Sequence, residues 1–277
     1  MPNAAALDLA LLPGARALLA AHALQLPQRD DLCGAFCGAL ALRAAGIEEH
    51  GDEPVDQDAV ALLAGSIVSG VRAAGVLPHG EPGRRDYRLS LPFTDDAGVS
   101  GTTAAGLVAA VHELSDERLV AIPFSGPWTA ATLGRLFDLA VVRERPVTLI
   151  ANLATRHLWG GQVSVGQLLD YLLDGVHAGP EPDWDVGHFV CVIGRLRGPG
   201  GVLYGVADTY PSLGRGGIHV QPAERLAAAI ERRDMPAGGV IVVACREDAD
   251  ALRGGAGAVG LIEGLWDNGT ATQATPR

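Results

Sequence analysis

Apolar residues recur with the spacing of an amphipathic helix in several stretches of the first half of the chain. Helices are expected over residues 13–26, 33–45, 58–69, 103–114 and 129–142. Pro13 suits the first turn of a helix, and Gly46 suits the end of another. The stretch 79–92 is rich in Gly, Pro and Arg, so we expect a loop there.

From Pro146 onward the apolar runs become shorter and take the form of strands. Strands are expected over residues 147–151, 188–195, 201–207, 218–221 and 239–244, with a helix over 222–233. Gly198-Pro199-Gly200 joins two of these strands and predicts a hairpin. Helices first and antiparallel strands later indicate an α+β fold, and not alternating βαβ units.

The chain has 277 residues, of which 48% are apolar and 19% charged, as in an ordinary globular protein. We expect a single domain over residues 1–264, with a helical half (1–145) and a strand-rich half (146–245). The polar residues 265–277 are expected to form a disordered tail.

Charge and composition narrow the classes of function. The net charge of −11 disfavours a nucleic-acid partner, and no apolar run approaches the roughly 18 residues of a membrane span. Met1-Pro2-Asn3 lacks the basic region of a secretory signal, so we expect a cytoplasmic protein with reduced cysteines. All 21 basic residues are arginines, which excludes lysine Schiff bases and Walker-type phosphate binding.

Cys33 stands where a loop becomes a helix, and this makes it the candidate nucleophile. Free N–H groups and the positive end of the helix dipole favour a thiolate at such a position. Gly34 is expected to leave room for a substrate backbone beside the sulfur. Asp30 and Asp31 are expected to complement the helix dipole, although their charges would oppose a thiolate.

A thiolate nucleophile needs a base and a group that orients the base. His188 begins one strand of the predicted hairpin, and Asp208 follows the end of the next strand. Because hairpin pairing brings a strand's start beside its partner's end, we expect His188 and Asp208 to be neighbours.

These motifs resemble a known family. Cys33-Gly34-x-x-Cys37, the later Gly187-His188-Phe189-Val190 and then Asp208 are similar to the papain-like cysteine peptidases, closest to the double-glycine-leader (bacteriocin-processing) group. The resemblance implies a papain-like fold, in which a central nucleophile-bearing helix packs on a C-terminal antiparallel sheet. It also implies Cys33 as nucleophile, His188 as base and Asp208 as the orienting group.

The family also has an oxyanion glutamine about six residues before the nucleophile. Gln28 lies five residues before Cys33 and is our candidate, while Gln25 lies eight before it and stays an alternative. The segment 46–150 is longer than in the minimal family, and its role is open.

The expected function is a thiol-dependent hydrolase that cleaves a peptide or amide bond through a Cys-His-Asp triad and an acyl-enzyme. The alternatives are a papain-fold acyltransferase or amide-forming enzyme, and an inactive papain-like binding module. The expected partner is a peptide or a small amide or thioester, with no cofactor and no metal; the oligomeric state stays open.

The sequence contains three further patterns that bear on function. Cys37 lies one helical turn after Cys33 and is expected to pack in the core, although it is a second candidate nucleophile. A metal site from Cys33, Cys37, His188 and Cys191 is disfavoured, because alternate strand positions would point His188 and Cys191 to opposite faces. The run 255–260 spells a dinucleotide-binding fingerprint but lacks a following βαβ unit, so we expect a flexible tail there.

Overall fold

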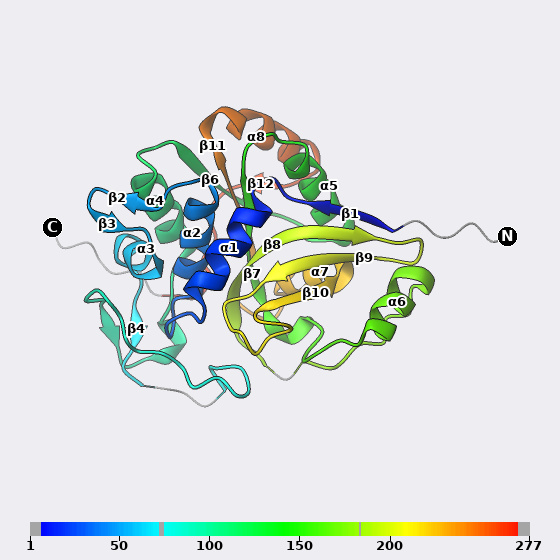
Figure 1. The fold of residues 1–277 in the computed structure, drawn as a ribbon, viewed down its shortest axis with the longest axis horizontal. Coiled ribbons are helices and arrows are strands. Elements are labelled where there is room, and N and C mark those ends of the chain that lie inside the picture. Colours follow the sequence, from blue (N-terminus) through cyan, green and yellow to red (C-terminus); the bar gives the residue numbers. More distant parts are fainter. Residues whose placement is uncertain (1–6, 72–74, 183, 271–277) are drawn as a thin grey trace.

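The computed structural model describes residues 7–71, 75–182 and 184–270. Within these residues an antiparallel sheet of eight strands runs through the molecule (Figure 1). Seven strands follow the order β10-β9-β8-β7-β11-β6-β12. The eighth, β1, pairs with residues 194–197 of β8, beyond the part of β8 that pairs with β7. The strands are β1 (Asp8–Leu11), β6 (Leu119–Ser125), β7 (Val147–Ala154), β8 (Gly187–Arg197), β9 (Val202–Ala207), β10 (Ile218–Pro222), β11 (Gly239–Cys245) and β12 (Ile262–Glu263).

Helices cover both faces of this sheet (Figure 1). On one face lie α2 (Cys33–Ala44) and α4 (Ala104–Leu114), flanked by α1 (Ala15–Gln25) and α3 (Gln57–Leu63). On the other face lie α5 (Ala130–Val141), α7 (Ala223–Glu231) and α8 (Ala249–Ala258). The outlying α6 (Val165–Asp174) packs Tyr171 and Leu172 against Leu203 of β9.

The remaining elements are short. They are the strand pairs β2 (Glu49–His50) with β3 (Glu53–Pro54) and β4 (Val68–Ser69) with β5 (Phe93–Thr94), and the single 3₁₀ turns η1 (Ala97–Val99), η2 (Thr155–His157) and η3 (Arg246–Asp248).

The two helical layers explain why the central strands are mostly apolar on both of their faces. In β7, Leu149 and Ala151 belong to the core under α5, α7 and α8, whereas Ile150 belongs to the core under α2. Successive side chains of a strand point to opposite faces, so a sheet covered on both sides needs apolar residues throughout. Burial on both faces holds β7 and β8 rigid, and β8 carries His188.

The helix α2 is surrounded by protein on all sides, and its glycines allow this. A Cβ on Gly34 would lie 2.9 Å from Cβ of Thr102 and 3.2 Å from Cδ2 of Phe189. A Cβ on Gly38 would lie 2.6 Å from Cδ1 of Leu107. The expectation that Gly34 makes room for a substrate is therefore wrong, because Thr102 and Phe189 fill that space.

The α+β prediction is confirmed at the level of a mixed structure with a large antiparallel sheet. The predicted helices over 33–45, 103–114 and 129–142 match α2, α4 and α5, and the 188–207 hairpin matches β8 and β9. The helix expected over 58–69 ends at Leu63. An interior strand, β6, lies in the half that we expected to be helical.

The C-terminal part also differs from expectation. The glycine-rich run 255–260 continues and ends α8, so it is not a flexible tail. Trp266 lies in the core beside α2, although we expected disorder from residue 265. Residues 271–277 of the expected tail lie outside the described residues.

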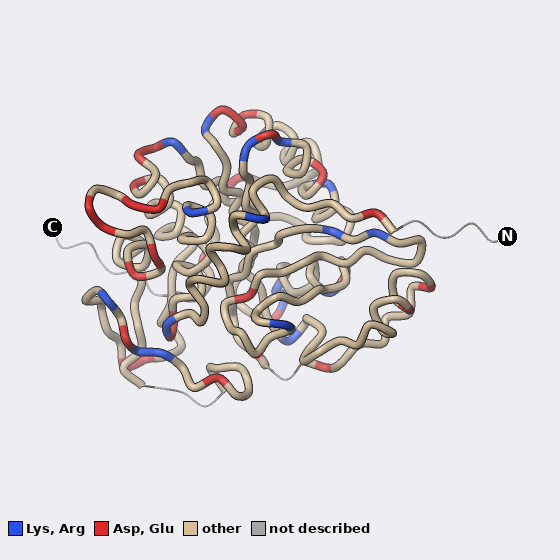
Figure 2. The backbone as a smooth tube through the Cα atoms, in the orientation of Figure 1, with Lys and Arg blue, Asp and Glu red and all other residues tan. Residues whose placement is uncertain are grey.

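Charged residues lie mainly in loops and at helix ends around the sheet, and the central strands carry few of them (Figure 2). Among the described residues, no helix combines the length and the apolar character needed to cross a bilayer.

Candidate functional site

Cys33 is the first residue of α2, and its side chain is half-buried in a cavity of about 310 Å³. No side chain caps this helix end, where Leu32 is the N-cap residue. The first N–H groups of a helix lack partners within the helix, so they face the same region as the sulfur. The cavity is also lined by Gln28, His188 and Arg232.

His188 and Asp208 meet across the β8–β9 hairpin. Cys191 of β8 pairs with Ala207 of β9, and this register brings the residue after β9 beside the start of β8. The His188 Nε2 atom lies 2.9 Å from Oδ1 of Asp208, and both side chains are buried. The backbone N–H of Thr209 donates to the same carboxylate oxygen over 2.7 Å. Since Nε2 faces Asp208, Nδ1 is the ring nitrogen left for another partner.

The charges around His188 favour its protonated form. Burial lowers the pKa of the ring, but the Asp208 carboxylate and then the Cys33 sulfur outweigh burial and raise this pKa to about 10. Burial alone would raise the pKa of Asp208, yet His188 and His219 hold it well below its usual range. The His188 ring therefore interacts electrostatically with the Asp208 carboxylate and with the Cys33 sulfur.

Two aromatic rings fix the plane of the His188 ring. Tyr210 stacks on it with an angle of 18° between the planes, and Trp184 contacts it edge-on at 4.8 Å between centroids. These ring contacts limit the rotation of the imidazole.

A second histidine holds the other oxygen of Asp208. The Nε2 atom of His219 lies 3.1 Å from Oδ2 of Asp208, and Nε2 of Gln221 donates to Nδ1 of His219 over 3.2 Å. Sequence analysis missed His219. Its position was predictable in principle, because it lies on the expected strand that follows the hairpin.

These shifts predict how stability depends on pH. Protonated His188, with a pKa raised from 6.5 to about 10, contributes fully below pH 6.5 and loses its contribution as pH rises through about 10. Ionised Asp208, with a lowered pKa, contributes above its ordinary value of 3.8 and loses its contribution as pH falls below it. The ion pair of His188 and Asp208 therefore stabilises the fold fully between pH 3.8 and pH 6.5.

We expect the free energy of unfolding of the wild type to exceed that of His188→Gln most near pH 5.5, and the difference to shrink steadily toward about pH 10. Urea unfolding at three pH values measures it. A difference that grows with pH would contradict a protonated His188 in the folded protein.

Of the two candidate glutamines, only Gln28 lies at this cavity among the described residues. Its side chain is buried, its Oε1 has no partner in the described part of the chain, and its backbone N–H donates to Thr209 O over 3.0 Å. Gln25 instead donates through Nε2 to the carbonyl oxygen of Phe36 over 3.1 Å.

Asp30 and Asp31 do not complement the dipole of α2 as expected, since its first turn contains no acidic residue. Asp31 accepts the backbone N–H of Ser69 over 2.7 Å and the hydroxyl of Ser100 over 3.1 Å. Asp30 accepts the backbone N–H of Arg84 over 2.8 Å. The two carboxylates thus fasten part of the long segment 46–150 to the loop before Cys33.

Burial raises the pKa of Asp31 more than its hydrogen bonds to Ser69 and Ser100 lower it. This carboxylate lines the same cavity as Cys33.

The chain returns to this cavity near its C-terminal end. Asn268, Gly269 and Thr270 line the cavity, and Nδ2 of Asn268 donates to the carbonyl oxygen of Thr102 over 3.1 Å. Residues at opposite ends of the sequence therefore form the walls of one site.

Comparison with known proteins places the chain in a family. A sequence model described as a family of unknown function (DUF6885) matches residues 12–267. The chain belongs to the DUF6885 family. The matched segment includes Gln28, Cys33, His188, Asp208 and Arg232 and ends just before Asn268. No curated protein matches the chain.

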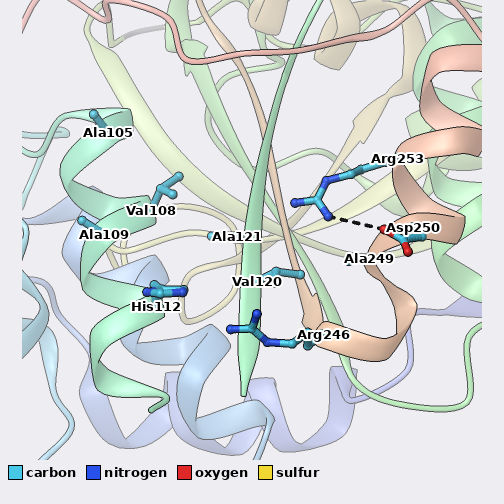
Figure 3. A pocket seen from close by; sticks show the side chains of 10 residues that line it. All are labelled: Ala105, Val108, Ala109, His112, Val120, Ala121, Arg246, Ala249, Asp250 and Arg253. Atoms are coloured by element: carbon cyan, nitrogen blue, oxygen red, sulfur yellow. Dashed lines mark ion pairs between the residues drawn. The ribbon is translucent and has the colours of Figure 1, made fainter. Parts of the chain in front are cut away.

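A wider hollow of about 600 Å³ lies elsewhere, between α4 and α8 across β6 (Figure 3). Its arginines already have acidic partners: Arg253 pairs with Asp250 and Glu263, and Arg246 pairs with Glu117. None of the residues that line it is a cysteine. Cys33, His188 and Asp208 thus have no counterpart in this hollow, and the cavity at Cys33 is the candidate site.

Proposed function

We propose that this chain is a thiol-dependent acyl-transfer enzyme with a papain-like arrangement, in which Cys33, His188 and Asp208 act as nucleophile, base and orienting group. One observation carries the proposal. A sulfur at the start of α2 shares a cavity with an imidazole from β8, and a buried carboxylate holds that imidazole. The nucleophile and the base are 155 residues apart in the sequence (188 − 33).

Acylation begins with the Cys33 thiolate beside protonated His188. The sulfur attacks the substrate carbonyl carbon, an S–C bond forms, and the carbonyl electron pair moves onto oxygen. When this tetrahedral species collapses, the bond to the leaving nitrogen breaks and the nitrogen takes the proton of His188. Asp208 and Tyr210 keep the ring in one orientation during this transfer.

Deacylation uses the neutral His188 that acylation leaves behind. An incoming water or amine attacks the thioester carbon and passes its proton to His188. The S–C bond then breaks, and the thiolate and the protonated imidazole are restored. Water as acceptor gives hydrolysis of a peptide or amide, which is the proposed reaction, and an amine as acceptor gives amide formation.

In this proposal Gln28 stabilises the oxyanion together with a backbone N–H of the first turn of α2, which is supported by its position in the lining of the cavity. We expect Gln28→Ala to lower kcat by about 10²- to 10³-fold, as for the loss of one oxyanion donor. Gln25→Ala is the matched control, since Gln25 bonds to Phe36 and does not line the cavity. Equal losses in both variants would show that Gln28 does not serve the oxyanion.

A generic activated ester tests the proposal without knowledge of the natural substrate. We expect p-nitrophenyl acetate to release one equivalent of nitrophenolate in a burst and to leave an acetyl group on Cys33, located by peptide mass spectrometry. Adding glycinamide to the acyl-enzyme separates the acceptors, because acetylglycinamide forms only where an amine competes with water. A folded protein with no acetyl group on Cys33 would leave a binding module as the remaining interpretation.

A further inference from the structure

Arg232 is a second charged group at the candidate site, and sequence analysis did not single it out. It follows α7 directly, and only 2% of its surface is exposed. It lines the same cavity as Cys33 and His188. Its backbone has φ of 46°, a left-handed conformation that non-glycine residues adopt at a cost.

The guanidinium of Arg232 has no acidic partner among residues 7–71, 75–182 and 184–270. The Nη1 atom donates to Oδ1 of Asn152 over 2.5 Å, while Nε has no partner in that part of the chain. A buried cation without a counter-charge is costly, because burial removes the water that would solvate it. The neighbouring Arg156, in contrast, pairs with Asp185 and Asp234.

Asn152 sets the orientation of this guanidinium. Its Nδ2 donates to the carbonyl oxygen of His188 over 3.4 Å, which turns Oδ1 toward Arg232 and toward Nε1 of Trp266. Because Asn152 occupies Nη1, the hydrogen-bonding capacity of Nε and Nη2 stays unused among the described residues. Two parallel N–H groups on one edge match the two oxygens of a carboxylate.

We propose that Arg232 binds a carboxylate of the substrate, so that the substrate class is an amide or thioester with a free carboxylate a few bonds from the reacting carbonyl. This inference rests on the proposed function of Cys33. The bound carboxylate supplies the acidic hydrogen-bond partner that Arg232 lacks among the described residues, and it holds the carbonyl beside the sulfur. The cavity volume of about 310 Å³ suits a small acid or the carboxyl end of a peptide.

Alkylation of Cys33 by a charged and a neutral reagent tests this assignment. Iodoacetate carries a carboxylate and iodoacetamide does not, and both react with the same sulfur. After normalisation to a free thiol in solution, we expect iodoacetate to be favoured by about tenfold or more, the effect of one charge-assisted hydrogen bond. In Arg232→Gln this preference, taken as the ratio of the two alkylation rates within the variant, should fall by the same factor.

Arg156→Gln is the matched control, because it removes a nearby arginine that already has acidic partners. It should keep the preference for iodoacetate. Arg232→Lys, which keeps the charge without the two-pronged edge, should retain part of the preference. If Arg232→Gln does not fold, the lysine variant and the wild type still give the comparison.

Protection experiments with a substrate-like acid complete the test. N-acetylglycine should slow the alkylation of wild-type Cys33 by iodoacetamide, whereas the neutral N-acetylglycinamide should not. An iodoacetate preference that survives in Arg232→Gln, or equal protection by both compounds, would overturn the role of Arg232. A Cys33 that reacts with neither reagent faster than a free thiol would instead overturn the proposed function.

Discussion

Replacing Asp208 by alanine is expected to lower the free energy of unfolding by about 3–5 kcal/mol, the cost of breaking a buried ion pair by removing one partner. Asp208 is 1% exposed, and its carboxylate accepts from His188, His219 and the backbone N–H of Thr209. Its loss leaves the buried His188 and the partly buried His219 without their shared acceptor. Urea unfolding near pH 6 measures the effect.

Two variants sharpen this test. Asp208→Asn keeps an oxygen for His188 but places an NH₂ group against one of its other donors, so we expect a smaller loss than with alanine. Asp86→Ala removes an exposed carboxylate that pairs with Arg84, and we expect a loss of about 1 kcal/mol or less. Equal losses in Asp208→Ala and Asp86→Ala would show that Asp208 does not hold the two histidines.

Replacing Cys33 by alanine is expected to abolish acyl transfer, with a loss in kcat of about 10⁶-fold, as for removal of a catalytic nucleophile. The fold should survive, because Cys33 is half-buried at the open end of α2 and makes no disulfide. Burst kinetics with an activated ester give the rate, and circular dichroism checks the fold.

Cys37→Ala separates the two candidate nucleophiles. Cys37 is completely buried, and this burial raises the pKa of its thiol well above the ordinary value. We expect this variant to lose some stability and to keep its reactivity. Full activity in Cys33→Ala with none in Cys37→Ala would reverse the assignment.

The local part of this architecture was predictable from the sequence. The helix that begins at Cys33 follows a loop and carries a continuous apolar run, and the hairpin from His188 to Ala207 has strands joined by glycines and a proline. The nearness of His188 and Asp208 followed from the register of a hairpin alone, because both belong to one antiparallel pair.

The missed elements depend on distant contacts. The seven residues of β6 are mostly apolar but include Pro123, which disfavours both a helix and an interior strand, so the local sequence does not predict the element. Its pairing with β11 and β12, over 100 residues later, decides the outcome. The glycines of α8 disfavour a helix locally, yet burial of Leu252 and Ala256 against the sheet holds it.

The parts of the site beyond the hairpin could not be read from spacing. Arg232 reaches the cavity from the end of α7, and Asn268 reaches it from near the C-terminus. Their chemistry is visible only once the sheet has brought α7 and the last described residues beside α2. Asp30 and Asp31 looked like helix-dipole residues because nothing local showed that residues 69–100 fold back onto them.

The pairing of the Cys33 thiolate with protonated His188 is the central claim, and the pH profile of Cys33 alkylation by iodoacetamide tests it most directly. At pH 6 an ordinary thiol is only about 0.3% ionised. The account predicts that Cys33 reacts at pH 6 almost as fast as at pH 8, and that His188→Gln makes the rate rise steeply with pH over this interval. A wild-type profile that rises as steeply as that of His188→Gln would contradict the pair.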